Sequence, residues 1–240
     1  MKEQKEQIEE TRIEGGTGFL ARAQAFIQKN QKMLIACGAV IVVVVGFLCL
    51  RAFVFTPHAQ ESAAKEVFYA ENYYSTGIMN NDTASLKKAL DGDGKHPGFK
   101  KIIDQHSGGL THGTPAIVNT CKFYAGIASL RLGKFDDAIK YLEDYSPKDY
   151  YTQSLTLMSL GDAYVEKGDN KKAIDLYVKA SETNPNDITS PAALFKAGMC
   201  SLAANDKDAA LKHFNTIKEK YPMSAEYSTI DYYIGIAEAK

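Results

Sequence analysis

The sequence has no excess of charge of either sign. Its 240 residues include 28 Lys and Arg and 29 Asp and Glu, which gives a formal net charge of −1 at pH 7. Because residues 1–32 have a net charge of +1 and Arg51 adds one more, residues 56–240 carry −3. Proteins that bind nucleic acid usually concentrate positive charge to neutralise phosphates. The charge balance therefore excludes nucleic acid as a partner.

Cysteine is also scarce, and its four positions include no C-x-x-C spacing. Cys37 and Cys49 lie in a long apolar run, whereas Cys121 and Cys200 lie far apart in predicted helices. A disulfide framework or a zinc site needs cysteines at closer spacing, so the sequence predicts neither. We expect Cys121 and Cys200 to be buried free thiols that pack as small apolar side chains. A disulfide between them is the alternative.

The motifs of catalytic and metal sites are missing as well. The five histidines include no pair four residues apart, and none lies near a cysteine at the spacing of metal ligands. There is no G-x-S-x-G, phosphate-binding loop or HExxH motif. Residues 91–94 place two aspartates at the spacing of a calcium loop, but Lys95 replaces the third acidic ligand, so we interpret them as a turn. The sequence predicts no enzyme, metal, cofactor or small-molecule substrate.

What the sequence does contain is a long apolar run, Met33–Phe55. No charge occurs from Met33 to Leu50. At a rise of about 1.5 Å per residue, such a helix matches a hydrocarbon core roughly 30 Å thick. We therefore predict a single transmembrane helix over residues 33–55. A cleaved signal peptide is disfavoured, because the whole segment 1–32 precedes the run and because signal peptides have a shorter apolar region.

The residues that flank this run predict its orientation. Arg22, Lys29 and Lys32 precede the run closely, whereas after Arg51 no Lys or Arg occurs before Lys65. Basic residues favour the cytoplasmic side of a membrane. The N-terminus is therefore predicted to be cytoplasmic, and the large C-terminal part is predicted to be translocated across the membrane.

Four segments follow from these patterns. Residues 1–32 form a predicted cytoplasmic tail, in which residues 18–30 form either an interfacial helix or an extension of the membrane helix. Residues 33–55 form the span, and residues 56–114 a helical linker with an irregular first helical pair. Within the linker we expect helices at 58–79, 82–90 and 97–106. Residues 115–240 are repetitive.

The repeat is marked by Gly126, Gly161 and Gly198, which recur at a nearly constant interval. In each unit an alanine and then a large side chain follow the glycine, and their distances from it are the same in all three units. These positions are Ala138, Ala173 and Ala210, then Leu142, Tyr177 and Phe214. Each unit is predicted to be a helix hairpin, with a Gly or Asn in its turn. One hairpin cannot bury its apolar face, so the hairpins must stack, and a capping helix is expected from Tyr227.

The second unit carries nearly all the positions of a known repeat: Leu160, Gly161, Tyr164, Gly168, Ala173, Tyr177, Ala180 and Pro185. These residues resemble the tetratricopeptide repeat family, although the first unit has Tyr150 in place of the closing proline and the chain has no tryptophan. The resemblance covers residues 115–240. It implies an all-α fold, in which one transmembrane helix is followed by an α-solenoid of helical hairpins with a C-terminal capping helix.

The layout of the whole chain resembles the YfgM family, an ancillary subunit of the Sec translocon in bacterial inner membranes. The shared features are a short tail, the segment FIQKNQK before one span, an alanine-rich helix at 59–74 and a small repeat array. The resemblance implies a single-pass inner-membrane protein with a periplasmic, chaperone-like domain. Its implied partners are the Sec translocon, a membrane-anchored prolyl isomerase and unfolded exported chains.

The inner wall of the solenoid is the predicted site of partner binding. In tetratricopeptide repeats the first helix of each hairpin forms most of this wall. By register its exposed positions are Thr120, Phe123, Ile127, Leu130, Leu155, Met158, Asp162, Val165, Phe195, Met199 and Leu202. An exposed apolar surface of this kind usually marks an interaction site. The alternative is that these residues are core, covered by the helix at 57–79 or by the terminal helix.

Two functions of different classes remain open from the sequence. The first is a non-enzymatic, membrane-anchored scaffold that acts as a chaperone-like accessory of the Sec translocon. The second is an organiser of the cell envelope, which links the membrane to wall-synthesis or division proteins, as other periplasmic tetratricopeptide proteins do.

Overall fold

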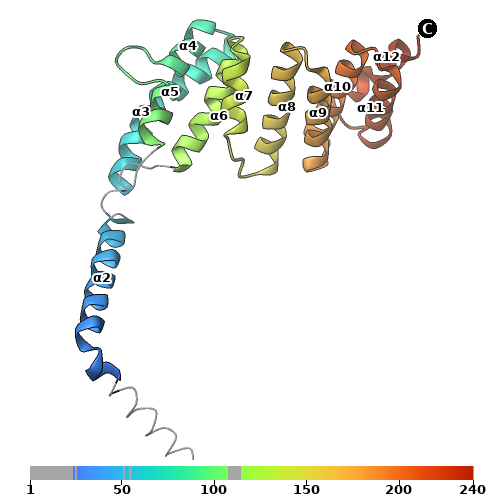
Figure 1. The fold of residues 1–240 in the computed structure, drawn as a ribbon. Coiled ribbons are helices and arrows are strands. Elements are labelled where there is room, and N and C mark those ends of the chain that lie inside the picture. Colours follow the sequence, from blue (N-terminus) through green and yellow to red (C-terminus); the bar gives the residue numbers. More distant parts are fainter. Residues whose placement is uncertain (1–23, 25, 51, 54–55, 108–114, 240) are drawn as a thin grey trace, which may run out of the picture. The chain divides into compact units, whose positions relative to one another are not determined.

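The computed structural model describes residues 24, 26–50, 52–53, 56–107 and 115–239. Within these residues, every regular element is a helix (Figure 1), so the predicted all-α class is confirmed. The chain divides into two compact units, Met1–Pro57 and His58–Lys240. Each unit is described by itself.

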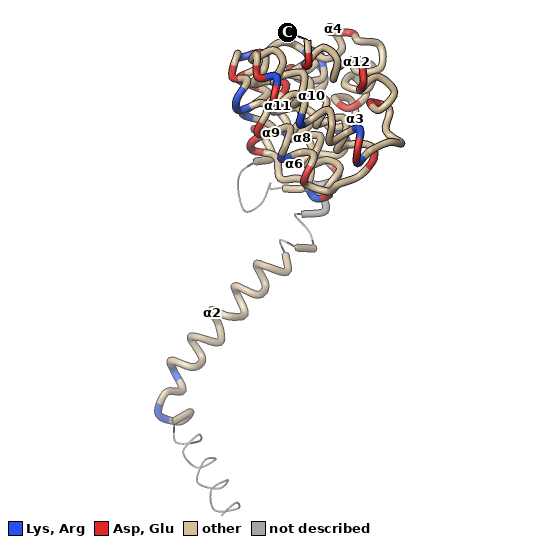
Figure 2. The backbone as a smooth tube through the Cα atoms, turned by 90° about the vertical axis from the view of Figure 1, so that its right-hand side faces the viewer, with Lys and Arg blue, Asp and Glu red and all other residues tan. Residues whose placement is uncertain are grey.

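The first unit contains helix α2, Gln31–Leu50. None of its residues is buried, and Figure 2 shows no charged residue on it beyond its first turn. By length and composition, α2 is able to cross a membrane. Residues 26–29 are helical and Asn30 forms a turn before α2. The predicted tail and most of the predicted helix at 18–30 lie outside the described residues.

The second unit is a series of helices joined by short connections. They are α3 (Thr56–Met79), α4 (Thr83–Asp91), α5 (Phe99–His106), α6 (Pro115–Arg131), α7 (Phe135–Glu143), α8 (Tyr150–Glu166), α9 (Asn170–Thr183), α10 (Thr189–Ala203), α11 (Lys207–Lys220) and α12 (Tyr227–Glu238). The connection at residues 108–114 lies outside the described residues.

Aspartate side chains cap the N-termini of four of these helices. The carboxylates of Asp82, Asp149, Asp169 and Asp206 accept hydrogen bonds from backbone N–H groups in the first turns of α4, α8, α9 and α11, at 2.8 to 3.0 Å. Such a cap satisfies an N–H that has no partner within the helix. The sequence therefore sets the start of each of these helices locally.

The start of α5 corrects one prediction. The helix expected from Pro97 begins at Phe99, because the preceding turn extends further than its sequence indicated. The carboxylate of Asp93 accepts hydrogen bonds from the backbone N–H groups of Lys95 and His96, at 2.8 and 2.6 Å. These bonds hold residues 93–96 in a turn, and the helix starts only after it.

Each repeat hairpin closes around its glycine. A Cβ atom added to Gly126 would lie 2.6 Å from Leu142, and one added to Gly161 would lie 2.5 Å from Tyr177. A Cβ atom added to Gly198 would meet the ring of Phe214. The glycine thus leaves room for the large side chain on the second helix of its hairpin, which is the pairing that the repeat predicts. Left-handed residues end the first helix of each hairpin, at Gly133, Gly168 and Asn205.

Stacking of the hairpins buries three apolar clusters along the array. The first contains side chains of α3, α4, α5 and α6, and Tyr141 of α7 packs against it. The second contains side chains of α8, α9 and α10, and the third contains side chains of α10, α11 and α12. Among the described residues, none of these clusters contains side chains of both α7 and α8. The boundary between the first two clusters therefore falls between α7 and α8.

The two cysteines of the second unit are buried free thiols, as expected. Cys121 is fully buried and Cys200 is 6% exposed. They lie in different apolar clusters, so the alternative of a disulfide between them is wrong. Burial raises the pKa of the Cys121 thiol to about 12, with a smaller effect from the charge of Glu71. Cys121 therefore behaves as a small apolar side chain.

Candidate protein-interaction surface

The first helices of successive hairpins line a groove of about 650 Å³. Four predicted wall residues meet in it, namely Ile127, Leu130, Asp162 and Val165. Side chains outside the predicted wall also line it, among them Arg131, Glu166, Tyr177 and Lys196. The groove thus receives residues from three hairpins, α6–α7, α8–α9 and α10–α11, which are distant in sequence.

Asp162 is the polar centre of this groove. Its Oδ1 atom accepts a hydrogen bond from the Tyr177 hydroxyl at 2.7 Å and another from Lys196 Nζ at 2.8 Å. The Tyr177 ring is buried against Gly161, so its hydroxyl needs an acceptor close by. Burial, followed by the negative charge of Asp162, raises the pKa of Tyr177. Tyr177 therefore stays protonated and donates its hydrogen bond over the physiological pH range.

A second pocket, of about 230 Å³, lies along the same wall and is lined mainly by apolar side chains. It contains Val165 of α8 together with Phe195, Met199 and Ala203 of α10. Val165 is 37% exposed and Met199 is 39% exposed. An apolar strip therefore runs beside the charged pair of Asp162 and Lys196.

Other predicted wall residues are partly or wholly core. Met158 is only 7% exposed and belongs to the second cluster, against which Leu155 also packs. The Phe195 ring lies 4.8 Å from that of Tyr233 on α12, and Leu202 packs against the third cluster. The terminal helix therefore covers part of the wall at Phe195, whereas Leu202 belongs to the packing of the third cluster.

The two predicted wall residues nearest the start of the array have other surroundings. The Phe123 ring lies 5.1 Å from that of Tyr145, in the connection that follows α7. Thr120 lines a third pocket, of about 330 Å³, with Ala64 and Val67 of α3. Helix α3 therefore lies beside the first half of α6.

The wall continues onto α12 at positions that sequence reasoning missed. Tyr232 and Ile236 follow Phe195 and Met199 at the same interval that separates Gly235 from Gly198, which is the spacing of the repeat. They are 69% and 41% exposed. The register that indicated Phe195 and Met199 would have identified both residues if it had been extended to the last helix.

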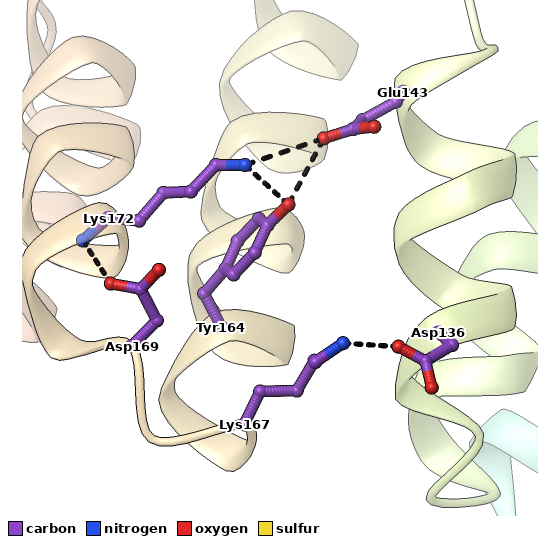
Figure 3. A network of polar contacts seen from close by, with 6 residues as sticks. All are labelled: Asp136, Glu143, Tyr164, Lys167, Asp169 and Lys172. Carbon is purple, nitrogen blue, oxygen red and sulfur yellow. Dashed lines mark hydrogen bonds and ion pairs between the residues drawn. The ribbon is translucent and has the colours of Figure 1, made fainter.

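Polar side chains also form contacts between α7 and the next hairpin (Figure 3). Lys172 Nζ lies 2.5 Å from the Tyr164 hydroxyl and 3.8 Å from Glu143, and that hydroxyl lies 3.2 Å from the same carboxylate. Lys167 pairs with Asp136 nearby. These contacts are exposed and place no charge in a closed pocket. Within the residues described here, no group of three His, Cys, Asp or Glu is placed to hold a metal ion.

Antiparallel helix hairpins that stack in series and line a shared groove define an α-solenoid, a class whose extended surfaces contact other proteins. Tetratricopeptide repeat models match the chain over residues 125–188 and 164–230. Residues 125–230 are therefore tetratricopeptide repeats, as their sequence predicts. Among proteins of curated function, none matches this chain. The resemblance to the YfgM family stays a prediction.

Proposed function

We propose that this protein is a membrane-anchored scaffold, without catalytic activity of its own, that binds polypeptide segments in the groove along its repeats. The tetratricopeptide repeats indicate a scaffold for protein contacts. The observation that carries the proposal is the groove itself, where an apolar strip adjoins the pair of Asp162 and Lys196. Such a surface suits an extended chain with apolar side chains and an unpaired polar backbone.

In this proposal α2 is the anchor. Its length and composition suit a span, and the basic residues before it favour a cytoplasmic N-terminus. The repeats then lie on the far side of a bacterial inner membrane, in the periplasm. A protein in this place is positioned to meet chains as they leave the membrane.

The resemblance in layout to the YfgM family leads to the finer proposal. The protein is a chaperone-like accessory of the Sec translocon, works beside a membrane-anchored prolyl isomerase, and receives unfolded exported chains in its groove. An envelope organiser with wall-synthesis or division partners is the alternative that the test must separate from it.

The test is brief crosslinking of the full-length protein in its own membranes, then purification in mild detergent and mass spectrometry. Val165→Glu and Met199→Glu place a charge in the apolar strip. Ile78→Glu is the matched control, because Ile78 is 36% exposed but lies at the end of α3, away from the groove. Both groove variants should lose the partners that the natural protein and the control recover.

Three outcomes distinguish the translocon accessory, the envelope organiser and a groove that binds no partner. Translocon subunits and a prolyl isomerase among the lost partners would support the finer proposal. Division or wall-synthesis proteins in their place would favour the envelope organiser. Equal recovery of all partners by every variant would show that the groove does not bind them.

A further inference from the structure

Large apolar side chains stand exposed where each repeat hairpin follows the one before. Tyr150 and Tyr151, at the start of α8, are 63% and 58% exposed. Ile188, just before α10, is 74% exposed, and Met223, in the connection before α12, is 88% exposed. Because successive helices are antiparallel, these connections lie at one edge of the array (Figure 1). We call the edge formed by these four residues the junction edge.

The backbone at this edge is held in place by hydrogen bonds. Asn186 Oδ1 accepts from the N–H groups of Ile188 and Thr189, at 2.9 and 2.8 Å. The Ser224 N–H, next to Met223, donates to the Tyr221 carbonyl at 3.1 Å. The apolar side chains are therefore presented outward by fixed turns, and their exposure does not result from a loose loop.

The opposite edge differs in chemistry. The turns between α6 and α7, α8 and α9, and α10 and α11 are Leu132-Gly133-Lys134, Lys167-Gly168-Asp169 and Ala204-Asn205-Asp206, and Leu132 packs against the first cluster. Met79, the last residue of α3, is an exposed apolar residue outside these three hairpins. Within the repeat hairpins, exposed apolar side chains thus gather at the connections between hairpins rather than at the turns within them.

The junction edge is also the edge at which the chain enters the second unit. Ala64 and Val67 of α3 line one pocket together with Ile117, near the start of α6, and Lys148, just before α8. Helix α2 ends at Leu50 and α3 begins at Thr56, so five residues separate them. Five residues reach at most about 18 Å when fully extended. The chain that connects α2 to α3 is therefore short.

We propose that the junction edge rests on the lipid headgroups of the membrane that α2 spans. The inference rests on the proposed function, in which α2 is the anchor. Tyrosine favours the membrane interface, since its ring is apolar and its hydroxyl stays hydrated. Lys148 at this edge is flanked by Asp149, and Asp187 precedes Ile188, so charge alone does not attract the edge to anionic lipid. Apolar contact is the driving force.

The absence of tryptophan allows single-tryptophan reporters in the full-length protein, reconstituted in phosphatidylcholine vesicles. Tyr151→Trp and Ile188→Trp report on the junction edge, and Lys171→Trp, at the start of α9, reports on the opposite edge. Phe47→Trp reports on α2. Vesicles contain lipid with a nitroxide on the headgroup or on the acyl chain. We expect the headgroup nitroxide to quench tryptophan fluorescence at residues 151 and 188, and the acyl-chain nitroxide to quench it at residue 47. Neither nitroxide should quench tryptophan fluorescence at residue 171.

The experiment distinguishes a failure of the proposed lipid contact from a failure of α2 as the anchor. Quenching at residue 47 without quenching at 151 and 188 would overturn the inference and leave the anchor intact. A blue-shifted emission at 151 and 188 without lipid quenching would show that protein, either a second copy or another chain, covers the edge instead. Loss of acyl-chain quenching at 47 would overturn the anchor, and with it the inference. Equal headgroup quenching at 171 would show that the contact is not specific to this edge.

Discussion

Gly198 and Gly235 occupy the same position of the repeat in different surroundings. A Cβ atom at Gly198 would meet the Phe214 ring, whereas one at Gly235 would meet nothing within 4 Å. Overpacking a core costs about 1–3 kcal/mol, while alanine is favoured over glycine in a helix by up to about 1 kcal/mol. We predict that Gly198→Ala lowers the free energy of unfolding and that Gly235→Ala leaves it unchanged or raises it. Urea unfolding followed by circular dichroism measures both, and equal effects would contradict the role of the glycine.

Tyr74 is expected to make the free energy of unfolding fall at alkaline pH. Burial, and then neighbouring Tyr124, raise the pKa of Tyr74 to about 12, although the charge of Arg131 opposes them. The folded state therefore holds this proton more tightly than the unfolded chain, whose tyrosines titrate near 10. The stabilising effect is complete below pH 10 and is lost as the pH rises through about 12.

Replacement of the hydroxyl tests this dependence. Tyr74→Phe should lessen the fall in the urea midpoint as the pH rises above 10. Tyr232→Phe is the control, since the Tyr232 ring is 69% exposed. An identical alkaline loss in the natural protein and in both variants would show that Tyr74 does not contribute to it.

At the scale of the elements, α7 is expected to be a weakly held part of the array. It has nine residues, of which only Ala138 and Leu142 are buried. Its contacts with the α8–α9 hairpin include the exposed ion pairs of Figure 3, and such pairs contribute little because water and salt screen them. By contrast, α9 and α10 share a buried apolar cluster.

We predict that α7 opens separately from α9 and α10. In native-state hydrogen exchange, amides of α7 should exchange through openings of lower free energy than the central amides of α9 and α10. Lys167→Ala should change the exchange of α7 only slightly, because the side chains of Lys167 and Asp136 are 41% and 86% exposed. Equal protection across the three helices would contradict a weak boundary at α7.

For the whole molecule, the prediction concerns its topology. If α2 spans the membrane, the full-length protein should stay in membranes washed with alkaline carbonate, and removal of residues 31–50 should release it. Protease added to spheroplasts should then digest the repeats and leave a short N-terminal fragment protected. Protection of the repeats instead would reverse the predicted orientation.

Helix boundaries and the pairing of the hairpins followed from residues close together in the chain. Asp82 caps α4 close to the predicted start of that helix, and Gly161 receives Tyr177 from the second helix of the same hairpin. Backbone hydrogen bonds and left-handed turn residues act within a few positions, so the pattern of residue types was enough to predict the repeat.

Exposure along the wall depended on neighbours that are remote in sequence. Met158 is buried between helices, Phe195 is partly covered by Tyr233 of α12, and Asp162 of α8 is paired with Lys196 of α10. A register indicates which face of a helix a side chain occupies, but the packing of other helices determines whether that face meets water. The repeat could therefore be predicted from residue types alone, whereas the groove and the division of the core into clusters arise only when the hairpins stack.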